Sequence, residues 1–133
     1  MGNLDGFFNP QIFRKDWPQI IATNVHLATF LGVRLAYNSS GYTAGQCLAL
    51  NSSTGLFQNY ASGGPNGTGT AVGFLYASVD VSEFPSATGS VVERMVTTGE
   101  LVNSLLIGND STADTQLQAR RFQGSLGVVI YKI

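Results

Sequence analysis

The stretch from Gly63 to Gly73, GGPNGTGTAVG, is where nucleotide chemistry would first be expected. A dinucleotide-binding fingerprint needs a strand, glycines spaced as G-x-G-x-x-G, and a helix whose N-terminus meets the phosphates. After Gly67 and Gly69 the third glycine falls one residue late, and the following residues, FLYASVDV, are typical of a strand. The Gly-Lys-Ser/Thr of a P-loop does not occur in the sequence. The stretch is therefore predicted to be a turn that leads into a strand.

The other residues that could do chemistry are His26, Cys47 and the carboxylates Glu83, Glu93 and Glu100. The only histidine and the only cysteine cannot build a histidine metal site, a cysteine zinc cluster or an intramolecular disulfide. His26 could act as a general base for Cys47 or a serine, but no G-x-S-x-G motif occurs, and Cys47 is interpreted as a buried apolar residue. Two of the glutamates could be paired by the fold as in a glycosidase, although such residues are usually solvated. The sequence predicts no catalytic residue, no cofactor and no metal site, and we expect a protein that is not an enzyme.

Composition favours a domain that adheres to other proteins. The 133 residues suit one compact domain, and 44% are hydrophobic, which is enough for a core. Only 11% are charged, against about 25% in an ordinary soluble domain. A surface so poor in charge is completed by uncharged polar residues or is partly buried against partners, as in persistent oligomers and virion components.

Nucleic acid and membrane partners are not expected. The net charge is −1, and the basic residues form no stripe that could follow a phosphate backbone. The apolar run from Ile20 to Tyr37 is broken by Asn24, His26 and Arg34, so it does not read as a membrane span. The N-terminal residues lack the apolar core of a signal peptide, which predicts synthesis in the cytoplasm.

From Ala44 onward the pattern is rich in strands. Short runs of Val, Leu, Phe and Tyr are separated by turn residues, at 46–50, 56–60, 71–81, 91–97 and 126–130. The one convincing helix is expected from about Thr112 to Gln123, with Ser111 as its N-cap, Asp114 in its first turn and Gly124 as its stop. The sequence therefore predicts a fold that is mainly β with a short α-helix (α+β).

The first 43 residues differ in character and are expected to form an N-terminal arm and lead-in segment (1–43) before the β-rich domain (44–133). This arm is dense in large apolar residues, namely Phe7, Phe8, Ile12, Phe13 and Trp17, with Pro10 and Pro18 favouring extended backbone. Two interpretations stay open. The segment is a strand-like flap on its own domain, or it is an arm that buries these side chains in a partner, since aromatic residues are typical interface anchors.

The order of segments from Ala44 to Ile130 resembles the small head decoration proteins of lambda-like tailed bacteriophages. The resemblance rests on the turn and strand of Ala44–Leu48, the strand of Thr54–Tyr60, the alternating TAVGFL of Thr70–Leu75, the apolar run of Val91–Leu101, and a helix with a closing strand, Gly127–Ile130. It covers about two thirds of the chain and its N-terminal region departs in sequence. TAVGFL is its most specific piece.

This resemblance implies a homotrimer on the outer surface of the mature virion head, bound at local threefold positions of the expanded shell. Its partner would be the major capsid protein, and its role would be to stabilise the shell against the pressure of packaged DNA. The alternative class is a carbohydrate-binding or tail-fibre β-module, in which Trp17, Tyr37, Tyr42 and Tyr60 would stack on sugar rings from one exposed face. An enzyme of unrecognised type, dependent on His26 and Glu93, is the third possibility.

Overall fold

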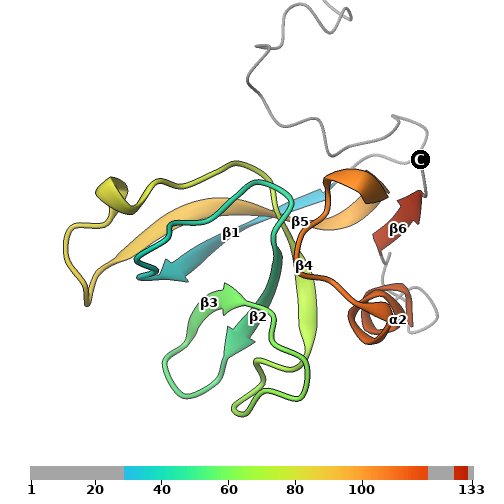
Figure 1. Ribbon diagram of the computed structural model, residues 1–133, viewed down its shortest axis with the longest axis horizontal. Helices are drawn as coiled ribbons and strands as arrows, with labels where there is room; N and C mark the ends of the chain where they lie inside the picture. Colours follow the sequence, from blue (N-terminus) through green and yellow to red (C-terminus); the bar gives the residue numbers. More distant parts are fainter. Residues whose placement is uncertain (1–28, 120–127, 132–133) are drawn as a thin grey trace, which may run out of the picture.

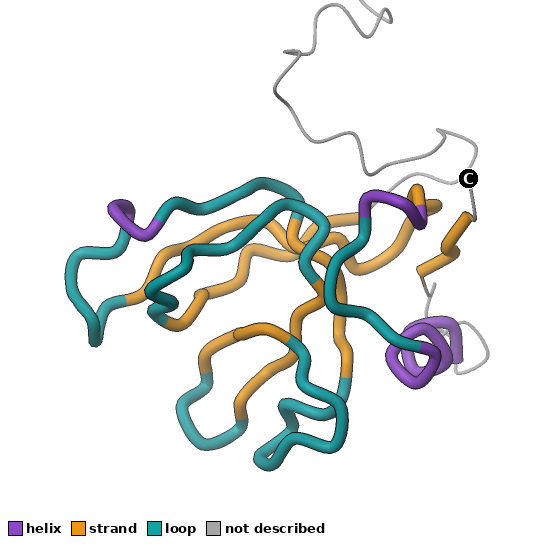
Figure 2. The backbone as a smooth tube through the Cα atoms, viewed as in Figure 1, coloured by secondary structure: helices purple, strands orange, loops and turns teal. Residues whose placement is uncertain are grey.

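The computed structural model describes residues 29–119 and 128–131, and most of its regular structure is β-strand. The strands are β1 (Thr29–Ala36), β2 (Cys47–Asn51), β3 (Leu56–Asn59), β4 (Ala71–Leu75), β5 (Ser90–Val102) and β6 (Val128–Tyr131). One α-helix, α2 (Ser111–Ala119), and two short 3-10 turns, η2 (Val81–Glu83) and η3 (Asn103–Leu105), complete the described elements (Figures 1 and 2). The predicted class, mainly β with a short helix, is confirmed.

The strands form a six-stranded sheet in the order β1-β3-β2-β4-β5-β6, which closes on itself because β1 also pairs with β5. The β1–β5 ladder is antiparallel and runs from Thr29↔Thr98 to Ala36↔Ser90. On its other side β1 meets β3 in parallel at one pair, Leu35↔Phe57. The result is a small barrel-like domain. Since β1 belongs to it, the sheet begins at Thr29, within the segment expected to lead into the β-rich domain.

The central strands bury side chains on both faces. Successive residues on β2, β4 and β5 enter different clusters, as side chains on a strand alternate between faces. Leu48, Leu75 and Met95 lie in the cluster inside the barrel, with Val33, Leu35, Tyr42, Val79 and Phe84. Cys47, Phe74 and Val96 lie in a second cluster with Tyr60, Leu101 and the helix residues Ala113 and Leu117. Helix α2 therefore covers the outside of the sheet beside β4 and β6, as Figure 1 shows.

Two glycines are required by the way β5 meets its neighbours. Gly99 has φ of 141°, which favours glycine, and it stands where the pairing of β5 passes from β1 to β6. Gly73 on β4 lies so close to β5 that an added Cβ would come within 2.6 Å of the Val96 carbonyl oxygen. A side chain at either position would disturb the crossing of the strands.

Strand β4 is shorter than predicted, ending at Leu75 rather than Val81. The chain bends at Tyr76 and Ala77 after β4, and a capping box follows: the Asp80 carboxylate accepts from the Ser82 N–H at 3.0 Å, and Glu83 accepts from the Asp80 N–H at 2.7 Å. These bonds start η2. Before it, Val79 pairs only in an isolated bridge with Tyr42.

Helix α2 is confirmed over residues 111–119, and the expected continuation to Gln123 lies outside the described residues. Its cap differs from the prediction. The side chain of Asp110, not Ser111, accepts from a first-turn amide, the Ala113 N–H at 2.8 Å. Neighbouring Asp and Ser residues are both good N-caps, so the sequence alone does not distinguish them.

A candidate interaction surface on strands β1 and β5

The outer face of the β1–β5 ladder carries large apolar side chains in contact with solvent. Phe30 is 40% exposed and Val92 is 61% exposed, while Leu31 at the end of the barrel is 50% exposed. The register places Phe30, Arg34, Val92 and Arg94 on the same face of the ladder, because Phe30 lies opposite Val96, Gly32 opposite Arg94 and Arg34 opposite Val92. We call Phe30, Arg34, Tyr76, Val92 and Arg94 the β1–β5 face. The other exposed large apolar side chains described are Tyr37, Leu50, Leu105 and Ile107.

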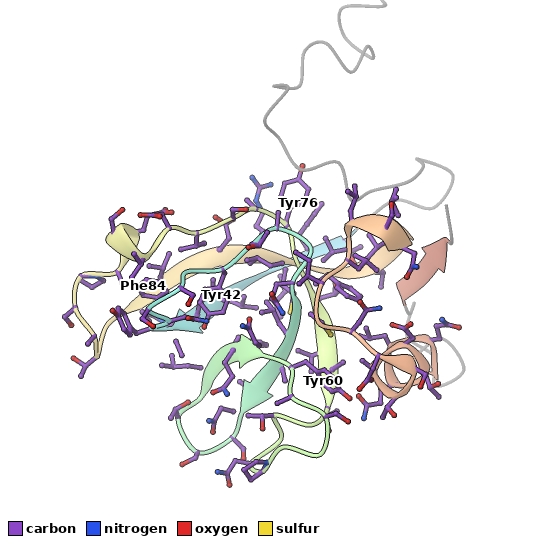
Figure 3. All side chains as sticks on the ribbon, viewed as in Figure 1. Tyr42, Tyr60, Tyr76 and Phe84 are labelled. Atoms are coloured by element: carbon purple, nitrogen blue, oxygen red, sulfur yellow. The ribbon has the colours of Figure 1, made fainter. Side chains whose placement is uncertain are left out.

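An aromatic pair and an arginine form the centre of this face. The rings of Phe30 and Tyr76 meet edge to face with centroids 5.0 Å apart and planes at 73°. The Arg94 guanidinium carbon lies 5.8 Å from the Phe30 centroid and 5.5 Å from that of Tyr76. These are cation–π distances, so the rings hold the guanidinium in place without neutralising its charge. Figure 3 shows Tyr76 at the upper surface, away from the labelled core rings.

The two arginines of the β1–β5 face form no ion pair with any described residue. Arg34 makes a long hydrogen bond, 3.4 Å, to the Ser90 hydroxyl, and the Arg94 guanidinium contacts the two rings. The described carboxylates already accept hydrogen bonds from local groups, as at Asp80, Glu83, Glu93, Asp110 and Asp114. The face therefore combines positive charge with aromatic and apolar area, the composition found at the centre of protein interfaces.

The glycine-rich stretch is a turn into β4, as predicted. Asn66 and Gly67 have positive φ values of 56° and 83°, which form the turn. Its amides donate inside the protein: Gly64 to the Ala61 carbonyl, Thr68 to that of Pro65, and Ala71 to the Gln116 side chain. A phosphate cradle needs such N–H groups turned towards the ligand, whereas these are occupied.

Some of the residues singled out from the sequence lie within the described structure and others lie outside it. Phe7, Phe8, Ile12, Phe13 and Trp17, the proposed binding arm, lie outside the described residues, as does His26. Cys47 is buried, which the sequence left open, and burial, with the charges of Asp114 and Asp110, raises its pKa to about 12. A thiol with that pKa is not a nucleophile at neutral pH. The Glu93 carboxylate accepts from the Arg94 backbone N–H at 2.8 Å.

The tyrosines expected to form a sugar-binding platform are not on one exposed face. Tyr42 and Tyr60 are only 5% and 7% exposed, and they belong to the two different core clusters. The Tyr42 hydroxyl donates to the Ala36 carbonyl at 2.7 Å, and the Tyr60 hydroxyl to Asp110 at 3.1 Å. The Tyr37 ring packs edge to face with the Phe84 ring, with centroids 5.5 Å apart. For Tyr42 and Tyr60 the platform hypothesis is wrong, because both rings are buried and their hydroxyls donate within the protein.

Sequence reasoning missed the β1–β5 face. Its signal was the alternation of Leu31, Val33 and Leu35 with Phe30, Gly32 and Arg34, which is the period of a strand with one buried face. Within the part of the chain that the structure describes, there is no group of three or more His, Cys, Asp or Glu residues that could hold a metal ion. The same residues include no helix long and apolar enough to cross a membrane.

Comparison with known proteins adds no relative. No protein-family model matches the chain. No curated protein matches it with significant sequence similarity.

Proposed function

We propose that this protein is a non-enzymatic capsid decoration protein of a tailed bacteriophage. It would bind the expanded head as a homotrimer at local threefold positions and stabilise the shell. The observation that carries the proposal is the β1–β5 face, where aromatic, apolar and arginine side chains lie exposed on a small closed β-domain. Adhesion to a protein lattice needs such a surface.

The order of elements supports the same proposal. The turn at Gly45 leads into β2, and β3, the glycine-rich turn, β4, β5, α2 and β6 follow in the sequence order on which the resemblance to head decoration proteins rests. Two potentially reactive groups of the described domain have structural roles. Cys47 packs in the core and the Asp110 carboxylate caps α2.

A decoration protein acts by linkage. If it binds the expanded lattice and not the precursor, each site stabilises the shell by RT ln(1 + [L]/Kd), where [L] is the free protein concentration. At about a hundred times Kd this is about 2.7 kcal/mol per site. A trimer that places three copies of a binding element on neighbouring capsid subunits also raises the effective concentration for the second and third contacts. Weak single contacts then suffice.

Co-sedimentation with phage heads tests the proposal. We expect the full chain to pellet with expanded shells and to stay in the supernatant with unexpanded ones. Deletion of residues 1–20 should abolish binding if Phe7, Phe8, Phe13 and Trp17 anchor the arm, while circular dichroism of the variant should retain the β signal. Failure of the full chain to bind expanded shells from any tailed phage tested, including the phage encoding it, would refute the function.

The oligomeric state is a separate test. We expect sedimentation equilibrium to give a trimer, either free or at the protein density reached on the shell. A species that stays monomeric at all concentrations and on the shell would contradict the trimer. The carbohydrate-binding alternative is not favoured by any described feature, since two of its four aromatic residues are buried.

A further inference from the structure

Among the described residues, strand β1 has one edge that is paired along its length and one edge that is largely unpaired, which we call the open edge. Towards β5 it is paired along its whole length, from Thr29 to Ala36. Towards β3, among the described residues, it is paired only at Leu35 with Phe57. The five residues before Leu35, 30–34, therefore present a strand edge without a described neighbour.

The register shows which backbone groups face the open edge. In an antiparallel ladder, residues turn their N–H and C=O groups alternately to one neighbour and to the other. The Arg94 carbonyl accepts from the Tyr76 N–H at 2.9 Å, so the backbone N–H and C=O groups of Arg94 point away from β1. Those of its neighbours Glu93 and Met95 therefore point towards β1. Their partners on β1 are Val33 and Leu31. The groups directed to the open edge are then the N–H groups of Phe30, Gly32 and Arg34 and the C=O groups of Phe30 and Gly32.

This edge is accessible to another backbone. Phe30, Leu31 and Gly32 are all exposed. A Cβ built on Gly32 would meet only one atom within 4.0 Å, the Cγ1 of Val92. Exposed edge strands are usually protected by proline, charged side chains or a bulge; residues 30–34 contain no proline, the register shift of the ladder lies before Phe30, and Arg34 is their one charged residue. An edge left open in this way is suited to accept a strand.

The side chains around the edge define the chemistry of the strand that fits. A strand added beside β1 would alternate between the outer face and the barrel end. On the outer face it would lie near the guanidinium groups of Arg34 and Arg94, which have no described carboxylate partner. At the barrel end it would cover Leu31. The complementary strand carries Asp or Glu at every second position and apolar residues between them.

We propose that the open edge of β1 binds an extended strand of alternating acidic and apolar residues from a partner protein. The inference rests on the proposed function only in naming a capsid subunit as the owner of that strand. Backbone hydrogen bonds to Phe30, Gly32 and Arg34 provide the pairing, and the arginines select acidic residues.

Hydrogen exchange of the full chain, followed by NMR, tests whether the edge is open. We expect slow exchange of the Leu31 and Val33 amides, which pair with β5, and fast exchange of the Gly32 and Arg34 amides. Protection of Gly32 and Arg34 at every protein concentration would mean that the chain's own residues fill the edge. Protection that grows with concentration would mean that a second copy fills it. Either result overturns the proposal.

A synthetic peptide then tests the chemistry. The probe is acetyl-Thr-Val-Glu-Val-Glu-Val-Thr-amide, with a control peptide in which Lys replaces both Glu. We expect the Glu peptide to shift and protect the Gly32 and Arg34 amides, and the Lys peptide to bind at least about tenfold more weakly, since charge complementarity across an interface discriminates partners. Absence of any change at these amides at millimolar Glu peptide, or equal binding of both peptides, refutes the proposal.

The matched variants are Gly32→Pro and Gly32→Ala. Proline removes the N–H directed to the open edge and leaves the ladder with β5 intact, whereas alanine keeps that N–H. We expect Gly32→Pro to lose peptide binding and Gly32→Ala to keep it. If Gly32→Pro unfolds, the double variant Arg34→Glu, Arg94→Glu is the second test. We expect this variant to prefer the Lys peptide over the Glu peptide. An unchanged preference for the Glu peptide would overturn the proposal.

Expanded shells separate this inference from the proposed function. If shells bind the full chain and Gly32→Pro equally and the Glu peptide fails, the edge proposal is refuted and decoration stands. If the Glu peptide binds and shells do not, decoration is refuted and the edge site stands. If shells bind the full chain and not Gly32→Pro, the strand belongs to the capsid.

Discussion

Gln116 joins helix α2 to the glycine-rich turn through both ends of its side-chain amide. Its oxygen accepts from the Ala71 N–H at 2.8 Å, and its nitrogen donates to the Gly69 carbonyl at 3.1 Å. Ala71 is fully buried at the start of β4, and the Gln116 side-chain oxygen is the acceptor for its N–H. We expect this amide to fix where the turn ends and the strand begins.

The perturbation is Gln116→Ala. It leaves a buried backbone N–H without an acceptor, which costs about 1–3 kcal/mol. With a urea m-value of about 2 kcal/mol/M, a loss of about 2 kcal/mol lowers the unfolding midpoint by about 1 M. Gln116→Glu keeps the acceptor for Ala71 but turns a carboxylate oxygen towards the Gly69 carbonyl, so it should also destabilise, and less so at acidic pH, where the protonated Glu can donate.

Urea unfolding followed by Trp fluorescence and circular dichroism measures both variants. Gln118→Ala is the matched control, because Gln118 lies on the same helix and is exposed. We expect Gln118→Ala to change the midpoint little and all m-values to stay equal. A midpoint for Gln116→Ala that matches the Gln118→Ala control would refute the view that α2 holds the turn through this amide.

Three further outcomes follow from the described residues. Cys47 should resist thiol reagents in the native protein at pH 8 and react on unfolding. Its folded pKa, about 12, lies above the unfolded value near 9, so the stability that the protonated thiol contributes is complete below pH 9 and is lost as the pH rises towards 12. Alkaline unfolding of Cys47→Ala, compared with the wild type, checks this. The hydrogen bond from the Ala113 N–H lowers the pKa of Asp110 from its usual value of 3.8. The stability that the ionised Asp110 contributes is therefore present above about pH 4 and is lost as the pH falls through the folded pKa. Asp110→Asn should make the stability depend less on pH in this acid range, and an unchanged pH dependence would contradict the cap. Gly73→Ala should lower the free energy of unfolding by about 1–3 kcal/mol because its Cβ meets the Val96 carbonyl, whereas Gly55→Ala, at an exposed turn with open space, reports only the cost of its positive φ.

Local patterns in the sequence were enough to predict most strands and the helix. Turn residues around Asn51–Gly55 and Gly63–Gly69 separated β2, β3 and β4 correctly. The 3-10 turn η2 could also have been predicted, because the spacing of Asp80 and Glu83 is that of a capping box. The choice between Asp110 and Ser111 as the cap of α2 could not, since adjacent residues of equal capping propensity are separated only by the path of the incoming chain.

The closure of the barrel was beyond local reasoning. Pairing of β1 with β5 joins residues about sixty positions apart, and nothing in either segment specifies the other. Because residues 7–17 are rich in aromatic side chains, residues 1–43 were interpreted as an arm and lead-in segment, and β1 was not predicted. The alternation of Leu31, Val33 and Leu35 nevertheless indicates a strand with one buried face. The Phe30–Tyr76–Arg94 cluster depends on this closure, so it was not predictable either.

The described polar groups differ in whether they are already hydrogen-bonded or paired within the protein. The carboxylates at η2 and α2 are held by local amides, and the turn amides before β4 donate within the protein. The two described arginines and the open edge of β1 are not used in this way, and they lie on the same strand and its neighbour. Guanidinium groups without a described carboxylate partner and strand-edge groups without a described neighbour lose least when a partner desolvates and pairs them, because no described ion pair or strand pairing has to be broken first. A partner should therefore approach the domain along β1, with its strand direction set by the edge and its charges set by the arginines.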